Sequence, residues 1–304
     1  MIIKSPEEFL IQLERGHYPA AAVARAKAVL MVEPADLSIS AESAIDNHYM
    51  NLDDTVDADR ALEQSRGLRD LLTSQGIEVA CFPGDPQTPD AIFPNNVFAT
   101  TKSRLIIGHM LHPDRQAEAK REDIRSYFQT RGYETIDLSQ LDCIAELTGV
   151  LIIDHARHIG FCGMTGRVDQ AGLVAMHDAF GLNMMFSFEL QPDEYHTNVI
   201  MMVLAGRACV IYPGAFVDPR VPEAIAKAFP GRTLELTEAE KNAFAGNCIA
   251  LSRKDLFMSQ TGVDALRPAS LANLEAWGFT IHSTSLDEIE KAGGSLRCLL
   301  AEIF

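Results

Sequence analysis

Gly293-Gly294-Ser295-Leu296-Arg297-Cys298-Leu299-Leu300 stands near the end of a chain of 304 residues and joins a glycine pair to a cysteine and an apolar run. Two consecutive glycines permit a tight turn and a close approach of backbone segments. The apolar residues 298–304 predict a final strand, so the turn would place the thiol of Cys298 where that strand begins. A free cysteine is often only a small core side chain. The role of Cys298 therefore depends on what the rest of the chain brings to the same place.

This strand start is the last of five similar starts. The apolar runs begin at Asn96, Gly149, Asn198, Asn247 and Arg297, and these residues are separated by 53, 49, 49 and 50 positions. A second strand, a helix and a third strand follow the first four starts, with the helices expected at 114–131, 168–181, 221–229 and 262–276. A constant period of about 50 residues is typical of a repeat architecture.

Before the repeats, the sequence predicts a helix at 5–14, a buried strand at 28–32, a loop at 35–55, a helix at 57–75 and a strand at 77–82. This segment supplies the later part of one more unit, and the opening strand of that unit would come from the carboxyl end of the chain. Closing the chain in this way leaves no exposed strand edge. The predicted fold is therefore α/β, a five-bladed αβ propeller of pseudo-fivefold ββαβ repeats, in a single domain of residues 1–304.

The alternative fold is an open, doubly wound α/β sheet. Closely spaced strand pairs argue against it, because a doubly wound sheet is built from parallel strands joined by right-handed crossovers. The hydrophobic fraction of 47% is that of an ordinary globular protein, so composition does not separate the two folds.

The composition excludes several classes of function. A net charge of −16 leaves no basic stripe for phosphates, so no nucleic-acid partner is expected. No apolar run reaches membrane-spanning length and the first residues do not read as a signal peptide, so we expect no membrane partner and a cytoplasmic location. The six cysteines are scattered and are expected to be reduced. A homodimer is expected only from the general frequency of oligomeric states.

Side chains with useful chemistry stand just before or at the strand starts. They are Asp90, Asn96, Glu146, His196, Asn198, Asn247 and Cys298. Equivalent positions in a ring of repeats converge at one end of its axis, so these side chains are expected to share one pocket. A nucleophile, a base, a carboxylate and amides are the components of acyl-type or amidine-type transfer. Each residue alone also has a structural explanation: a turn asparagine, a surface glutamate, a core histidine or a core cysteine.

This set resembles the guanidine-modifying, or pentein, superfamily of arginine deiminases, dimethylarginine hydrolases, arginine dihydrolases and amidinotransferases, whose fold is a five-bladed αβ propeller. The resemblance implies a catalytic Cys298 after the glycine pair, a catalytic His196 in His196-Thr197-Asn198-Val199 and a catalytic Glu146 in Glu146-Leu147-Thr148-Gly149. It also implies that Asp90-Ala91-Ile92-Phe93-Pro94-Asn95-Asn96 grips a planar guanidino group.

The chain departs from the family pattern in two respects. Leu147 follows the glutamate where the family has glycine, and Asn96 and Asn198 stand where deiminases have aspartate. Paired carboxylates hold a guanidinium by charge-assisted hydrogen bonds. An amide offers no countercharge, but it donates to a neutral oxygen. The segment is similar to that of arginine dihydrolases and citrulline-utilisation hydrolases, and Asn47 lies in a loop that resembles theirs.

The resemblance implies a hydrolase that cleaves a C–N bond at the guanidino or ureido carbon of arginine or citrulline and releases ammonia, with ornithine or citrulline as product. Cys298, as a thiolate, would form a covalent intermediate, His196 would transfer protons, and Glu146 would hold the leaving nitrogen. The expected partner is a small guanidino or ureido amino acid. Whether that amino acid is free, acylated or methylated is open.

The remaining candidates bind substrate. Arg167 stands where relatives bind the substrate carboxylate, although it also reads as a solvated residue before a helix. Asn198, Asn47 and Asn247 are weaker candidates for orienting the planar group. No metal or organic cofactor is expected, and the histidine pairs at 109/112 and 155/158 lack partners at metal-ligand spacing. The alternatives to a hydrolase are an amidinotransferase, in which an amine replaces water, and a non-catalytic binding module of the same fold.

Overall fold

The structure is a computed structural model that describes residues 1–16 and 26–304. In these residues the strands form five separate sheets with one pairing pattern. The first strand of each unit pairs antiparallel with the second, and the second pairs parallel with the third. Helical segments connect the second and third strands. The predicted α/β class is confirmed, and the ββαβ order is present in every sheet.

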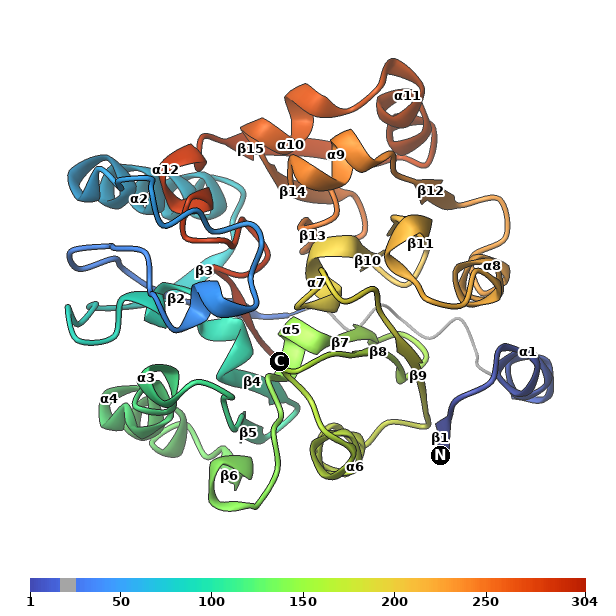
Figure 1. Cartoon of the computed structure of the whole chain (residues 1–304), viewed down its shortest axis with the longest axis horizontal. Helices are drawn as coiled ribbons and strands as arrows, with labels where there is room; N and C mark the ends of the chain where they lie inside the picture. The colour runs from blue at the N-terminus through green and yellow to red at the C-terminus, as the bar shows by residue number, and fades with distance from the viewer. Residues whose placement is uncertain (17–25) are drawn as a thin grey trace.

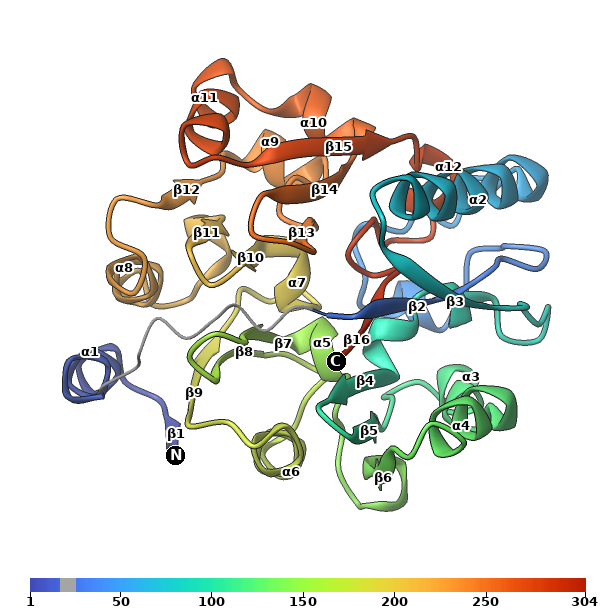
Figure 2. The same cartoon turned by 180° about the vertical axis from the view of Figure 1, so that it is seen from behind.

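One sheet joins the two ends of the chain. β16 (Ala301–Ile303) pairs antiparallel with β2 (Ala28–Val32), which pairs parallel with β3 (Glu78–Phe82), as Figure 2 shows from behind. Helix α2 (Ala58–Ser74) connects β2 to β3. The prediction that this unit takes its opening strand from the carboxyl end is therefore confirmed.

The other four sheets follow along the chain. Their strands are β4 (Phe98–Thr101), β5 (Arg104–Ile107) and β6 (Glu134–Asp137); β7 (Leu151–Asp154), β8 (Ile159–Met164) and β9 (Met184–Glu189); β10 (Met201–Leu204), β11 (Ala208–Ile211) and β12 (Thr233–Glu235); and β13 (Ile249–Ala250), β14 (Asp255–Ser259) and β15 (Thr280–Thr284). A short strand that the sequence did not predict, β1 (Ile2–Ile3), pairs with β9.

The sheets follow one another around the middle of the molecule, and helices lie outside them (Figure 1). The outer helices are α1 (Pro6–Arg15), α2, α3 (Pro113–Gln116), α4 (Glu122–Gln129), α6 (Gln170–Phe180), α8 (Arg220–Lys227) and α11 (Pro268–Ala276). The one-turn helices α5 (Leu147–Val150) and α7 (Thr197–Ile200) lie near the middle and contact each other. The other α-helices of the described residues are α9 (Glu238–Asn242), α10 (Gln260–Ala265) and α12 (Asp287–Glu290).

Two predicted helices are interrupted. The helix expected at 262–276 is divided into α10 and α11, because proline at 268 lacks an N–H donor and disfavours helical backbone in the residue before it. The helix expected at 114–131 is divided into α3 and α4, because the backbone of Arg121 leaves the helical region (φ −59°, ψ 97°). Predicted helices with clear caps are continuous: Asp169 caps the start of α6 and Gly181, with φ of 62°, ends it.

The predicted strand starts need correction. Each inner strand begins two to four residues later than expected, and the residues before it form a short helix or a turn. Asn96 ends a 3-10 turn, Gly149 and Asn198 lie in α5 and α7, and Cys298 lies in a turn before β16. These segments are apolar and buried on all sides, so hydrophobic periodicity does not distinguish one helical turn from a strand. The candidate polar residues therefore lie on turns rather than on strands.

Buried apolar side chains of the sheets and the outer helices belong to common clusters; Ala61 and Leu68 of α2, for example, share one with Val29 of β2. Within residues 1–16 and 26–304, no helix is both long enough and apolar enough to span a membrane. All five residues of β2 are buried, and the side chain of Leu30 has no exposed surface.

We expect Leu30→Ala to lower the free energy of unfolding by about 3 kcal/mol, because removing a fully buried leucine leaves a cavity in a packed core. Ile45→Ala is the matched control, since that side chain is 78% exposed, and it should change stability by less than about 0.5 kcal/mol. Urea unfolding followed by circular dichroism measures both. Equal effects would show that β2 does not pack as described.

Candidate active site

A pocket of about 290 Å³ gathers predicted site residues from distant parts of the chain. Its lining residues are Ser43, Asn47, Met50, Asp90, Phe93, Asn96, Arg115, Arg167, Tyr195, Ala292, Gly293, Gly294 and Cys298. Five of the nine predicted residues are therefore in the lining itself. The other four, Glu146, His196, Asn198 and Asn247, are hydrogen-bonded to Arg167, to Cys298 or to one another.

Cys298 is almost fully buried, with 2% of its surface exposed. Its thiol is contacted by the Nδ2 atoms of Asn247 at 3.3 Å and Asn198 at 3.5 Å. Burial raises the pKa of the Cys298 thiol, and the hydrogen bond from Asn247 opposes this rise. In the described residues the thiol has no hydrogen bond to His196.

Glu146 and His196 form a buried pair. Each residue immediately precedes a one-turn helix, Glu146 before α5 and His196 before α7, so the two occupy equivalent places in successive units. His196 Nε2 lies 2.8 Å from Glu146 Oε2. Because a carboxylate only accepts, Nε2 carries the proton, and the unprotonated Nδ1 is buried without a partner. Burial lowers the pKa of His196 more than Glu146 raises it, so the ring is neutral at neutral pH.

Arg167 holds Glu146 in the charged form. Its Nη1 atom donates to both oxygens of Glu146, at 3.3 and 3.2 Å, and the Leu111 amide donates to Oε1 at 3.0 Å. Burial favours the neutral acid, but Arg167 and His196 together hold the pKa of Glu146 far below its ordinary value. The other side of the guanidinium is bound by Asp46, at 2.6 and 2.8 Å. Arg167, predicted to bind a substrate carboxylate, is thus already paired with two protein carboxylates.

Two acceptors in the pocket have no partner. Asp90 Oδ1 and Asn96 Oδ1 are buried and accept no hydrogen bond. The other carboxylate oxygen of Asp90 accepts from the Ser43 hydroxyl at 2.5 Å. Burial raises the pKa of Asp90, and the charge of Arg115 opposes this rise. The pair therefore offers unsatisfied oxygen atoms to a ligand that carries several N–H donors.

Two backbone features explain how these groups approach one another. A Cβ atom on Gly149 would lie 2.7 Å from both Asn96 Oδ1 and His196 Cε1, so only glycine fits between them. Leu147, which replaces a family glycine, has a φ of 22° at the edge of the left-handed region. Its side chain is fully buried, and Gly108 leaves space for it because a Cβ there would lie 2.9 Å from Leu147 Cγ.

The predicted glycine pair anchors a second part of the site. Gly293 has a φ of 77°, a conformation that favours glycine. Its carbonyl accepts from Asn47 Nδ2 at 3.3 Å and from the Tyr195 hydroxyl at 2.6 Å. Asn47 therefore binds the protein backbone and still lines the pocket.

The sequence did not single out several residues of the site. They are Ser43, Asp46, Arg115 and Tyr195. Arg115 is 3% exposed and is held by Glu118 at 2.9 and 3.0 Å, although charged side chains are mostly exposed. Asp46 stands next to Asn47 in the chain, which was the available signal for it.

The histidine pairs do not line this pocket, although His112 is hydrogen-bonded to the site residue Asp46. His109 contacts the carbonyl of Leu141, His112 contacts Asp46, and the His155 ring packs against Phe304. In the part of the chain that the structure describes, no group of three or more His, Cys, Asp or Glu side chains is placed to hold a metal ion.

Comparison with known proteins gives concordant matches. Residues 33–304 match the model of the family described as N,N dimethylarginine dimethylhydrolase, eukaryotic. The chain is 24% identical over 245 residues to the bifunctional arginine dihydrolase/ornithine cyclodeaminase AgrE of Nostoc sp., covering 81% of this chain and 33% of AgrE. It is 23% identical over 289 residues to the N(G),N(G)-dimethylarginine dimethylaminohydrolase of Mycobacterium tuberculosis, covering 94% and 88% of the two chains. The chain spans about a third of the length of the bifunctional relatives that it matches.

Solved structures agree on the fold. The substrate-bound N-terminal domain of the cyanobacterial arginine dihydrolase ArgZ has a TM-score of 0.79 at 21% identity, covering 91% of this chain and 97% of that domain. A dimethylarginine dimethylaminohydrolase adduct with S-methyl-L-thiocitrulline has a TM-score of 0.72 at 18% identity, covering 91% and 100%.

Gly149→Ala is expected to lower the free energy of unfolding by about 1–3 kcal/mol, because the added methyl group overpacks the contact between Asn96 and His196. Gly67→Ala, in α2, is the matched control: the nearest atom to its Cβ is Thr284 Oγ1 at 3.6 Å. A helical glycine replaced by alanine should stabilise the protein by about 0.5–1 kcal/mol. Urea unfolding gives both values, and equal stability of the Gly149→Ala and Gly67→Ala variants would contradict the packing around Gly149.

Proposed function

The chain belongs to the family described as N,N dimethylarginine dimethylhydrolase, eukaryotic, and from that premise we propose that it is a cysteine-dependent hydrolase of an arginine-like amino acid. The predicted resemblance to the guanidine-modifying superfamily is confirmed by this match. The proposed reaction is cleavage of a C–N bond at the guanidino or ureido carbon, with release of ammonia.

One observation carries the proposal. A buried thiol, Cys298, lines the same pocket as two unpaired buried acceptors, Asp90 Oδ1 and Asn96 Oδ1. Buried acceptors without partners are rare in folded proteins. A guanidino or ureido group is flat and rich in N–H donors, so it would satisfy these acceptors while presenting its central carbon to the sulfur.

The first half of the reaction forms a covalent bond. The S–H bond of Cys298 breaks, the proton passes to the free Nδ1 atom of His196, and the sulfur electron pair attacks the central carbon. His196 then returns the proton to the departing nitrogen, which leaves as ammonia. Because His196 is neutral in the free protein, the bound guanidinium cation is the charge that favours the thiolate.

The second half releases the product. His196 takes a proton from water, the resulting hydroxide adds to the same carbon, and the C–S bond breaks. The departing sulfur takes the proton that His196 holds, and the new hydroxyl group loses its proton to solvent as the C=O bond forms. Both oxygens of Glu146 already accept from protein donors, so Glu146 acts by fixing the tautomer and orientation of His196. Arg167 in turn positions Glu146. We propose these positioning roles for Glu146 and Arg167 instead of the predicted contacts with the substrate.

Asn96 favours two successive hydrolyses. Hydrolysis of arginine once gives citrulline, whose ureido group is neutral. An asparagine donates to that neutral oxygen as readily as it accepts from a guanidinium, whereas an aspartate would repel it. A second cycle on citrulline releases another ammonia and a carbamate, which decomposes to carbon dioxide and ornithine. We therefore propose an arginine dihydrolase, with Asp90, Asn96 and Asn47 as substrate-binding residues.

Two other functions remain as alternatives. An amidinotransferase would use an amine in place of water at the second half of the reaction. A non-catalytic binding module would need neither the thiol nor the Glu146–His196 pair. The family description also makes dimethylarginine a candidate substrate, so the product analysis below includes it beside arginine.

We also propose the finer features of the fold and setting. The common strand pattern and the circular order of the sheets support a five-bladed αβ propeller formed by residues 1–304 as a single catalytic domain. A cytoplasmic location and a homodimer remain predictions from the sequence.

Cys298→Ala should abolish turnover, because it removes the sulfur that forms the covalent bond to the substrate carbon. The protein is incubated separately with L-arginine, L-citrulline and N,N-dimethylarginine, and ammonia, citrulline and ornithine are measured by mass spectrometry. Cys81→Ala, at a partly exposed cysteine in β3, is the control and should retain full turnover. Full activity of the Cys298→Ala variant would exclude the mechanism.

Asn96→Asp should shift the product of arginine from ornithine with two ammonia to citrulline with one. The added charge favours the guanidinium cation and repels the ureido oxygen of citrulline. Asn273→Asp makes the same chemical change on the exposed surface of α11 and should leave the product ratio unchanged. If Asn96→Asp gives the same products as the unchanged protein, Asn96 does not determine the number of hydrolytic steps.

A further inference from the structure

Two side-chain amides contact the sulfur of Cys298 from different units of the fold. Asn247, in the turn before β13, places Nδ2 3.3 Å from Sγ, and Asn198, in α7, places Nδ2 3.5 Å from it. All three residues are buried, with exposed fractions of 0–2%. Both asparagines were predicted as substrate-binding residues, but neither lines the pocket.

The orientation of Asn247 is fixed by its other hydrogen bonds. Its Oδ1 atom accepts from the backbone amides of Arg297 at 2.9 Å and Cys298 at 3.4 Å. Its Nδ2 atom also donates to the Asn198 carbonyl at 2.9 Å. Since every contact of Oδ1 is a donor, the NH₂ group must face the sulfur. Asn247 therefore holds both the backbone and the side chain of the nucleophile.

Asn198 offers both kinds of hydrogen bond. Its Oδ1 atom lies 3.8 Å from Sγ and accepts from the neutral thiol, while Nδ2 at 3.5 Å donates to sulfur. The neutral thiol thus has an acceptor, and the thiolate has two donors. The two amides can therefore form hydrogen bonds with both the thiol and the thiolate form of Cys298.

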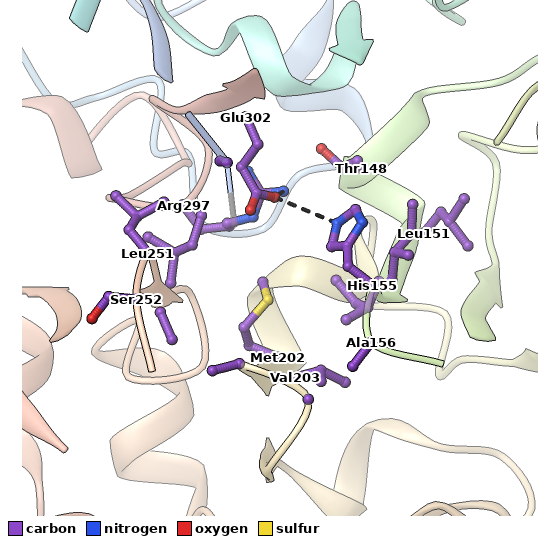
Figure 3. A pocket seen from close by; sticks show the side chains of 17 residues that line it. Thr148, Leu151, His155, Ala156, Met202, Val203, Leu251, Ser252, Arg297 and Glu302 are labelled. Carbon is purple, nitrogen blue, oxygen red and sulfur yellow. Dashed lines mark hydrogen bonds and ion pairs between the residues drawn. The ribbon is translucent and has the colours of Figure 1, made fainter. Parts of the chain in front are cut away.

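No cationic side chain contacts the sulfur within the described residues. The nearest basic residue in the chain, Arg297, directs its guanidinium into a different hollow of about 620 Å³. There it pairs with Glu302 at 3.2 Å, and His155 faces the same carboxylate at 3.9 Å, as Figure 3 shows. The two amides are therefore the side-chain donors to the sulfur, while the Ser295 backbone and the charge of Arg297 also oppose the rise in the pKa of the Cys298 thiol.

The charged and titratable groups around Cys298 are few. Tyr195 and, across the pocket, Asp90, Arg115 and Arg167 line the same space, and Arg297 precedes the cysteine in the chain. Both arginines of the pocket are engaged by carboxylates, Arg115 by Glu118 and Arg167 by Glu146 and Asp46. Their charges are thus largely compensated before they act on the sulfur.

We propose that Asn247 and Asn198 are catalytic residues whose amide groups donate hydrogen bonds to the sulfur of Cys298 and hold it as a thiolate for attack. The proposal rests on the proposed function only in taking Cys298 as the nucleophile. When the S–H bond breaks, the proton is accepted by His196 and the electron pair stays on sulfur, facing both N–H donors. An aspartate at either position would replace a donor by a negative oxygen.

The test measures the reactivity of Cys298 without requiring turnover. The rate of alkylation by iodoacetamide is followed from pH 6 to 10 in the complete chain, and the peptide containing Cys298 is quantified by mass spectrometry. In Asn247→Asp and Asn198→Asp we expect the midpoint of the pH profile to rise by about one pH unit, with about a tenfold slower reaction at pH 7, because a hydrogen bond to a charged group is lost. Asn273→Asp adds the same charge on an exposed helix surface and should leave the profile unchanged.

The outcomes separate this proposal from the proposed function. Asn198→Ala removes the amide without adding charge, so it tests the same hydrogen bond if an aspartate variant does not fold, and urea unfolding identifies such a variant. A raised midpoint in folded variants supports the proposal even if arginine, citrulline and dimethylarginine are not turned over. An unchanged midpoint in the folded variants overturns it, whatever the substrate.

Discussion

The ion pair between the fully buried carboxylate of Glu146 and the guanidinium of Arg167 is the interaction on which the rest of the site depends. An unpaired charge at such depth costs several kcal/mol, roughly 3–5 when one partner is removed. Neither group is satisfied by the other alone. Arg167 also needs Asp46 from the loop at 35–55, and Glu146 also needs the Leu111 amide and His196. Through Arg167, Glu146 therefore holds the loop that carries Asp46. Through its contact with Nε2, Glu146 also fixes the tautomer of His196 and leaves Nδ1 unprotonated.

The repeated unit explains how side chains so far apart in sequence meet. Glu146 and His196 precede equivalent one-turn helices 50 residues apart, and Asn247 and Cys298 occupy equivalent turns in the next two units. Each unit contributes one or two polar groups where its inner strand begins. No single unit contains a complete set, so the site exists only when all the sheets are assembled and β16 has paired with β2.

The sequence was sufficient for the period, the order of elements and the nine candidate residues that the structure brings together in and around one pocket, because a strict spacing of polar residues before buried runs is visible without knowledge of contacts. It was insufficient for the strand starts, since a run that is buried on all sides has no periodicity to distinguish a helical turn from a strand. It also missed Arg115 and Asp46. Charged residues are normally solvated, and only the three-dimensional contacts show that Glu118 and Arg167 compensate these two charges.

Charged carboxylates and neutral amides occupy different places in the site. The carboxylates that stay charged, Glu146 and Asp46, lie against Arg167, while the groups in contact with sulfur are the neutral amides of Asn198 and Asn247. A carboxylate beside sulfur would disfavour the thiolate, and a cation there would compete with a guanidinium substrate. Neutral donors avoid both effects. Under the proposed dihydrolase function, an amide at Asn96 would suit a pocket that accepts a cation in one cycle and a neutral urea in the next. In that proposal the three asparagines serve a substrate whose charge changes during the reaction.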